Sequence, residues 1–132
     1  MQRTHIAVVD TNVLVYDLVE NSPFHMDARE RLNKLDAVVL LPNILVEFIL
    51  VTSVKLKMDQ EIVKGKVEEI LRNSVIARVT RRDFKTVLGL HLNMREINDH
   101  LLVAVAKRLK LPVLSYDSDV INLCTRFGVE TI

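Results

Sequence analysis

The sequence contains no tryptophan, one cysteine, three glycines and three prolines among its 132 residues. Because Cys124 is alone, an intrachain disulfide and a cysteine-based zinc site are excluded, and we expect a reduced, cytoplasmic setting. The glycines, Gly65, Gly89 and Gly128, are too far apart to form a phosphate-binding Gly-rich loop, which excludes Rossmann and P-loop nucleotide binding. No Gly-x-Ser-x-Gly motif is present, so nothing supports a serine hydrolase.

The sequence also lacks a long hydrophobic run and a large excess of charge of one sign. The longest apolar stretch, residues 37–51, is interrupted by polar side chains and is too short to span a bilayer, so we expect no membrane contact. The formal net charge of +1 provides no overall attraction to nucleic acid, and any basic surface must arise locally. With 49% hydrophobic and 27% charged residues, the sequence predicts one folded domain over residues 1–132.

Short runs rich in β-branched residues alternate with longer stretches of helical periodicity. The predicted strands cover residues 6–9, 37–41, 75–79, 112–116 and 129–132. The predicted helices cover residues 12–19, 25–35, 43–58, 59–73, 80–92 (capped by Thr80), 98–110 and 118–127. Strands separated by helices predict the α/β class, here a three-layer α/β/α sandwich around a central, mostly parallel five-stranded sheet.

Three acidic residues fall where predicted strands end or where a following helix begins. Asp10 and Asp117 follow the first and the fourth strand, and Glu47 lies near the start of the helix after the second strand. In a parallel α/β sheet these positions share one edge, where ligand sites are built. We therefore expect the three side chains to lie close together.

A fourth acid, Asp99, is predicted to reach the same edge by a different route. The helix from Asp99 to Lys110 advances about 16–18 Å, at about 1.5 Å per residue. After the turn that follows, five residues of strand return about 16 Å toward Asp117. Because the two distances match, Asp99 and Asp117 are expected to end beside Asp10.

Clustered carboxylates are unstable unless a cation lies among them. Glu47 sits in an apolar segment, residues 44–51, where an unpaired ionised carboxylate is unfavourable. Repulsion among neighbouring acids adds to this penalty and raises their pKa values. A divalent ion removes both penalties, and all-oxygen ligands favour Mg²⁺ or Mn²⁺. The sequence therefore predicts a metal site formed by Asp10, Glu47, Asp99 and Asp117.

Each acid also has a purely structural interpretation. Asp10 is suited to cap the helix that follows it, and Asp99 to stabilise a helix N-terminus as a dipole partner. Asp117 is suited to a turn or a cap, a role for which Asp119 is the better candidate. Glu47 is suited to an ion pair with a lysine or an arginine. The convergence of all four acids is what favours the metal site.

Taken in order, these motifs resemble the PIN domain family. Residues 8–14, Val-Val-Asp-Thr-Asn-Val-Leu, are similar to the opening signature of that family, in which a strand runs into Asp-Thr/Ser-Asn. Glu47 within an apolar helix resembles the second acid of the family. Residues 98–106, followed by residues 111–119, resemble the segments of the third and fourth acids in context and spacing. The resemblance spans nearly the whole chain and implies a nuclease.

Size and acid spacing look most like the VapC-type toxins of toxin–antitoxin pairs. The resemblance implies a Mg²⁺- or Mn²⁺-dependent endoribonuclease that acts on RNA, forms a homodimer and is restrained by a small antitoxin. It also implies that Asp10, Glu47, Asp99 and Asp117 are the catalytic metal ligands. Asp119 would be a further ligand or would orient the ligands through hydrogen bonds.

Two polar residues are predicted to orient the metal ligands. Asn12 lies two residues after Asp10, and Ser115 is expected to point to the same strand face as Asp117. Helix capping and ordinary strand polarity are the alternative roles of Asn12 and Ser115. One departure from the family is visible, since many relatives have an aromatic residue where this chain has Val120.

Three other functions remain compatible with the sequence. One is a PIN-type RNA-processing nuclease outside a toxin–antitoxin pair. A second is an aspartyl-phosphate phosphotransfer domain. Against it, Asn12 stands where a haloacid-dehalogenase-like phosphatase needs a second Asp, and Thr80 follows the third strand where a receiver domain needs an Asp. The third is a non-catalytic binding module with the PIN fold, and the retention of all four acids argues against it.

Overall fold

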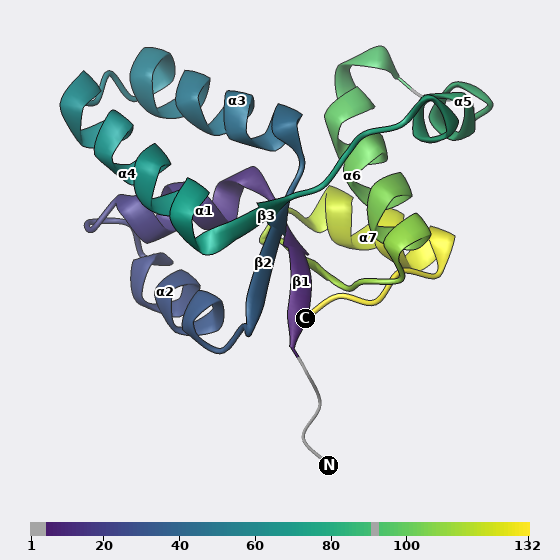
Figure 1. Cartoon of the computed structure of the whole chain (residues 1–132), viewed down its shortest axis with the longest axis horizontal. Coiled ribbons are helices and arrows are strands. Elements are labelled where there is room, and N and C mark those ends of the chain that lie inside the picture. The colour runs from purple at the N-terminus through teal and green to yellow at the C-terminus, as the bar shows by residue number, and fades with distance from the viewer. Residues whose placement is uncertain (1–4, 91–92) are drawn as a thin grey trace.

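The structure, a computed structural model, describes residues 5–90 and 93–132, which form a parallel four-stranded sheet between two groups of helices (Figure 1). The strands are β1 (Ile6–Val9), β2 (Ala37–Leu40), β3 (Ser74–Ile76) and β4 (Val113–Leu114), in the order β3-β2-β1-β4. Val8 of β1 is paired with both Val39 of β2 and Val113 of β4. The predicted α/β class and its three layers are confirmed.

Helices cover both faces of the sheet (Figure 1). On one side lie α1 (Thr11–Leu18), α2 (His25–Asn33), α3 (Pro42–Leu50) and α4 (Gln60–Asn73). On the other side lie α5 (Arg81–Leu88), α6 (Ile97–Leu109) and α7 (Ser118–Phe127). A π-helical turn (Val51–Lys55) continues α3, and a 3₁₀ turn (Met94–Glu96) precedes α6. None of the helices within the described ranges combines the length and apolar character that crossing a bilayer requires.

The direction of the chain across the sheet reverses at β4. From β1 it moves outward to β2 and β3, then returns across the sheet to β4 on the opposite side of β1. Right-handed connections therefore place the helices of the first two crossovers on one face and those of the last on the other. Ligands of such sheets bind at the carboxyl ends of the strands where the direction changes. Asp10 directly follows β1 and Ser115 directly follows β4, so both lie at this point.

The strands are apolar on both faces because helices cover both faces. Ala7, Val8 and Val9 of β1 have no exposed surface. Phe48 of α3 and Leu102 of α6 are fully buried in the same core. The sheet is thus tightly packed on both faces, and this packing fixes the positions of the residues at its carboxyl edge.

The predicted fifth strand, residues 129–132, is not formed, and the sheet of the described residues has four strands. The segment makes two backbone hydrogen bonds with Val113, of 2.9 and 3.1 Å, but only an isolated bridge results. The physical reason lies in β4, which has two residues. Both bonds belong to Val113, so the pairing with residues 129–132 extends over a single position of β4. A fifth strand therefore has too short a partner.

Some helix boundaries also differ from the prediction. The helix predicted over residues 43–58 is α3 followed by the π-helical turn. Buried Thr52 donates its hydroxyl to the Phe48 carbonyl at 2.7 Å, which competes with the regular helical ladder. The helix predicted to reach residue 92 ends at Leu88, and residues 91–92 lie outside the described part of the chain.

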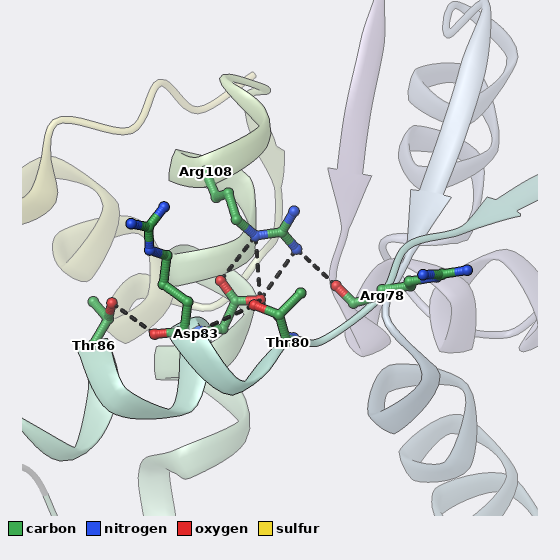
Figure 2. A network of polar contacts seen from close by, with 6 residues as sticks. Arg78, Thr80, Asp83, Thr86 and Arg108 are labelled. Carbon is green, nitrogen blue, oxygen red and sulfur yellow. Dashed lines mark hydrogen bonds and ion pairs between the residues drawn. The ribbon is translucent and has the colours of Figure 1, made fainter.

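An ion pair joins Arg108 of α6 to the buried Asp83 of α5 (Figure 2). Asp83 is 2% exposed and forms a capping box with Thr80. The Arg108 guanidinium donates to the Asp83 carboxylate at 3.0, 3.3 and 3.1 Å and to the Arg78 carbonyl at 2.8 Å. Burial by itself would raise the pKa of Asp83, but Arg108 and Thr80 hold that pKa below its ordinary value. Because α6 also carries Asp99, this network helps to fix the position of that acid.

Candidate active site

The four acids that were predicted to meet line one cavity at the carboxyl edge of the sheet. The cavity, which we call the acid pocket, has a volume of about 310 Å³. It is lined by Asp10, Thr11, Asn12, Val15, Tyr16, Glu47, Val51, Lys55, Asp99 and Asp117. These residues come from α1, α3, the π-helical turn, α6 and the loops after β1 and β4, so both halves of the chain contribute to the pocket.

Asp10 is the most buried of the four acids, with 5% of its surface exposed. Its Oδ1 accepts the Thr11 N–H at 2.8 Å as the N-cap of α1, and its Oδ2 accepts the Ser115 hydroxyl at 2.7 Å. Burial raises the pKa of Asp10 and the charge of Asp117 raises it further, against the effect of these hydrogen bonds. Asp10 therefore caps a helix and also faces the other acids.

Ser115 and Asn12 connect the two sides of the acid pocket. Besides donating to Asp10, Ser115 Oγ accepts the Asp117 N–H at 3.0 Å. Asn12 Nδ2 lies 3.4 Å from both Asp10 Oδ2 and Ser115 Oγ, while Asn12 Oδ1 accepts the Tyr116 N–H. The two residues predicted to orient the acids are therefore bonded to them, across the junction between β1 and β4.

Glu47 projects into the acid pocket from α3, with Asn98 as its hydrogen-bond partner. Asn98 Nδ2 donates to Glu47 Oε2 at 3.4 Å, and Asn43 Nδ2 in turn donates to Asn98 Oδ1 at 3.2 Å. Burial raises the pKa of Glu47, and the charge of Asp10 adds to that effect. The alternative of an ion pair with a lysine or arginine is not observed among the described residues.

Asp99 lies in the first turn of α6 and is half-buried. Its pKa is raised from 3.8 to about 6, mainly by burial and then by the negative charges of Asp10, Asp117 and Glu47. A carboxyl group whose pKa is raised by three other carboxylates shows that the four acids interact electrostatically. Their mutual repulsion would be relieved by a cation between them.

Asp117 and Asp119 are two residues apart in the sequence but line different cavities. Asp117 is the N-cap of α7, because its Oδ1 accepts the Asp119 N–H at 2.8 Å. The preference for Asp119 as the capping residue was therefore wrong. Asp119 lies outside the acid pocket and lines an adjoining cavity of about 290 Å³ together with Asp99 and Arg126. Asp99 is shared by the two cavities.

The chemistry of the acid pocket fits a hydrated divalent ion. Within residues 5–90 and 93–132, no three acidic, histidine or cysteine side chains are close enough to hold a metal by themselves. Mg²⁺, however, usually keeps several waters and takes only one or two carboxylates directly. The buried Thr11 Oγ1 forms no well-aligned hydrogen bond with the described residues. It lies near enough to Glu47 to favour the ionised form of that carboxyl group, which partly offsets the rise in the pKa of Glu47. Four carboxylates and this hydroxyl are donors of the type that Mg²⁺ or Mn²⁺ prefers.

Lys55 is a pocket residue that the sequence prediction missed. Of the described residues that line the acid pocket, it alone is cationic. Glu47, Val51 and Lys55 lie at intervals of four residues, and four residues of α-helix overshoot one turn by about 40°. In a π-helix, whose hydrogen bonds are i→i+5, four residues fall short of a turn. The overshoot in the α-helical part and the shortfall in the π-helical part oppose each other. Glu47, Val51 and Lys55 therefore stay on the side of the helix that lines the pocket.

Comparison with known proteins is consistent with this geometry. The model of the PIN domain family matches residues 7–125. No curated protein matches the sequence significantly. Among solved structures, the VapC20 toxin of Mycobacterium tuberculosis, described as cleaving the sarcin–ricin loop, is 15% identical, with 89% of this chain and 94% of that chain covered and a TM-score of 0.76.

Two toxin–antitoxin structures are also similar in fold. VapBC2 from Rickettsia felis, bound to a DNA fragment from its promoter, is 17% identical, covers 96% of this chain and 97% of that chain, and has a TM-score of 0.66. A toxin–antitoxin complex from Klebsiella pneumoniae is 17% identical, with 87% and 89% covered and a TM-score of 0.62. At these identities the likeness concerns the fold. Because the family match runs from β1 into α7, the chain belongs to the PIN domain family.

Proposed function

We propose that this chain is a Mg²⁺- or Mn²⁺-dependent endoribonuclease that hydrolyses RNA phosphodiester bonds in the acid pocket. The observation that carries the proposal is the convergence of four carboxylates, of which Asp10, Glu47 and Asp99 have raised pKa values. Membership in the PIN domain family supports it. The likeness in fold to VapC20, a toxin described as cleaving the sarcin–ricin loop, supports RNA as the substrate.

In this proposal the residues of the pocket have distinct roles. A divalent ion, when bound, would supply the Lewis acidity that activates a water and neutralises charge on the phosphodiester. Ser115 and Asn12 keep Asp10 in a fixed orientation through their hydrogen bonds. Lys55 attracts the phosphate toward the acids. Asp10, Glu47, Asp99 and Asp117 would hold the ion, and Asp119, which lines the adjoining cavity, would be a further ligand or would orient the ligands through hydrogen bonds.

The proposal extends to a cytoplasmic toxin with a small antitoxin as its protein partner. Its support is the similarity in fold to proteins solved as toxin–antitoxin complexes. A homodimer is also part of the proposal, because α3 and its π-helical extension expose Val46, Leu50 and Val54 at 55%, 54% and 66%. Such a contiguous apolar surface is typical of an interface. If the chain is a toxin, co-expression with the product of a small reading frame directly upstream of its gene should suppress RNA cleavage. If it is an RNA-processing nuclease outside a toxin–antitoxin pair, cleavage should be unaffected.

The main experiment compares Asp10→Asn with the wild type in an RNA cleavage assay. We expect Mn²⁺ or Mg²⁺ to support cleavage by the wild type, and EDTA or Asp10→Asn to abolish it, because a metal ligand is lost. Glu68→Gln, an exposed carboxylate on α4, is the matched control and should remain active. Circular dichroism checks that each variant is folded. Cleavage by Asp10→Asn at the wild-type rate would disprove the site, and labelling by acetyl phosphate would favour a phosphotransfer domain instead.

A further inference from the structure

Aromatic side chains are scarce in this chain but concentrated beside the acid pocket. The sequence has no tryptophan, two tyrosines and four phenylalanines. Both tyrosines and Phe24 form what we call the aromatic cluster, made of Tyr16, Phe24 and Tyr116. The Tyr16 centroid lies 5.0 Å from that of Phe24 and 5.4 Å from that of Tyr116, and Phe24 and Tyr116 are 5.3 Å apart. Half of the aromatic residues are thus in mutual contact.

The aromatic cluster leads from the surface into the acid pocket. Tyr16 lines that pocket, and Tyr116 directly precedes Asp117 in the chain. Phe24, in the connection between α1 and α2, is 44% exposed. Tyr16 and Tyr116 are partly buried against the main core, so Phe24 has the most exposed ring of the cluster. The cluster therefore presents aromatic surface to solvent next to the four carboxylates.

Polar contacts hold the rings in place. The Tyr116 hydroxyl donates to Asp27, and Arg31 pairs with Asp27 at 3.0 Å while its guanidinium carbon lies 5.7 Å from the centre of the Tyr116 ring. The backbone of Tyr16 is tied by a 2.8 Å hydrogen bond between its carbonyl and His25 Nδ1. The Tyr116 ring and the Tyr16 backbone are thus held in place before a ligand arrives, Phe24 packs on both tyrosine rings, and Arg31 adds a positive charge next to them. A fixed aromatic surface beside a cation suits a planar ligand attached to a phosphate.

We propose that the aromatic cluster binds an unpaired nucleobase of the RNA, adjacent to the phosphodiester held in the acid pocket, with Phe24 as the stacking surface. This inference rests on the nuclease function proposed above and specifies its substrate as RNA with an unstacked base, in a loop or a single strand. In duplex RNA the bases are stacked on one another and are not accessible to side chains. Every base has a π-face, so the stacking tolerates different sequences.

Tyrosine fluorescence provides a direct test, because the chain lacks tryptophan and both tyrosines belong to the cluster. A short single-stranded RNA with a fluorescent label is titrated into Asp10→Asn, which prevents cleavage, in Mg²⁺. We expect the RNA to quench the tyrosine emission, and the same strand in a duplex to quench it far less. The anisotropy of the label gives the affinity independently of the tyrosines.

Variants at Phe24 separate stacking from packing. Phe24→Leu keeps an apolar side chain but removes the ring, and should weaken binding of the single strand by about five- to a hundredfold. Phe24→Trp should restore the affinity. Phe84→Leu is the matched control, because Phe84 is 43% exposed on α5 and is not part of the aromatic cluster, and it should bind RNA like the protein without this substitution.

The outcomes distinguish this inference from the proposed function. If the wild type cleaves RNA but Phe24→Leu binds it with unchanged affinity and only a lower melting temperature, the cluster is a packing feature and the inference is wrong. Equal quenching by duplex and single strand, or quenching by a protein partner but not by RNA, would also overturn it. If the wild type cleaves no RNA in Mg²⁺ or Mn²⁺, the nuclease function itself fails, and the inference fails with it.

Discussion

The Ser115 hydroxyl donates a 2.7 Å hydrogen bond to Asp10 Oδ2, although the two residues are 105 positions apart in the chain. Ser115 follows β4 and Asp10 follows β1, so the bond spans the point where the sheet changes direction. The same hydroxyl oxygen accepts the Asp117 N–H at 3.0 Å. One small side chain thereby sets the relative position of two of the four acids.

Ser115→Ala should both weaken metal binding and destabilise the fold. The substitution removes a partner from Asp10 and from the Asp117 N–H, and should lower the free energy of unfolding by about 1–2 kcal/mol. Loss of a group that orients a ligand should reduce Mn²⁺ affinity about tenfold or more, as measured by calorimetry. Ser118→Ala, at an exposed serine, is the control. Unchanged Mn²⁺ affinity in Ser115→Ala would show that the hydroxyl does not orient a ligand.

The raised pKa of Asp99 predicts an unusual pH dependence of stability without metal. Burial and the charges of Asp10, Asp117 and Glu47 raise this pKa from 3.8 to about 6. Such a carboxyl contributes stability that is present below about pH 4 and is lost as the pH rises through about 6. In EDTA, the wild type should therefore become less stable relative to Asp99→Asn over this range, by about 1 kcal/mol after allowance for solvent screening of a half-buried group.

Urea unfolding of both proteins at several pH values measures this difference. Adding Mg²⁺ near neutral pH should reverse the order, because an ion bound to the folded wild type stabilises it. A stability difference that stays constant between about pH 4 and pH 6.5 would mean that the carboxylates do not interact as described.

Lys55→Met should raise KM for RNA with a smaller effect on kcat. The lysine lines the acid pocket but is not one of the carboxylates, so its loss removes attraction for phosphate and leaves the metal ligands in place. For single-stranded RNA, the slope of log KM against log salt should fall by about 0.7 for one lost phosphate contact. Lys64→Met, on the exposed side of α4, should leave both KM and the slope unchanged. Identical salt dependence in Lys55→Met and wild type would exclude the contact.

Asp83→Asn tests the network that holds α6 (Figure 2). The substitution leaves Arg108, whose side chain is 31% exposed, without its carboxylate, and should lower the free energy of unfolding by about 2 kcal/mol. Because the pKa of Asp83 is lowered, its contribution is present above its ordinary pKa of 3.8 and is lost as the pH falls through the lower folded value. Urea unfolding at neutral pH and near pH 3 measures both effects. If Asp83→Asn is as stable as the wild type at neutral pH, then apolar packing alone, and not this network, stabilises the position of α6.

The gathering of the acids followed from rules that act on the whole chain. Parallel strands present their carboxyl ends at one edge, which placed Asp10, Glu47 and Asp117 together. The length of α6 matches the return of the chain through β4, which placed Asp99 with them. These relationships depend on the length and order of elements, and both are visible in a sequence.

Features that depend on individual tertiary contacts were not predictable in this way. Beyond β4 the Tyr116 N–H donates to the Asn12 side chain, and residues 129–132 pair with Val113 alone, so those residues form no fifth strand. The π-helical turn accompanies the hydrogen bond from Thr52 to a helix carbonyl, and it brings Lys55 to the pocket. The 3.6-residue periodicity that predicts a helix contains no information about such a local change in winding.

The position of β1 between β2 and β4 has a consequence for how the molecule tolerates thermal motion. β1 is paired with a strand on each side, and its Ala7, Val8 and Val9 are fully buried, so their amides should be among the last to exchange with deuterium. Asp10 directly follows this strand, whereas Phe24 lies in the connection between α1 and α2. Any local motion in that connection would leave Asp10 in register with the sheet.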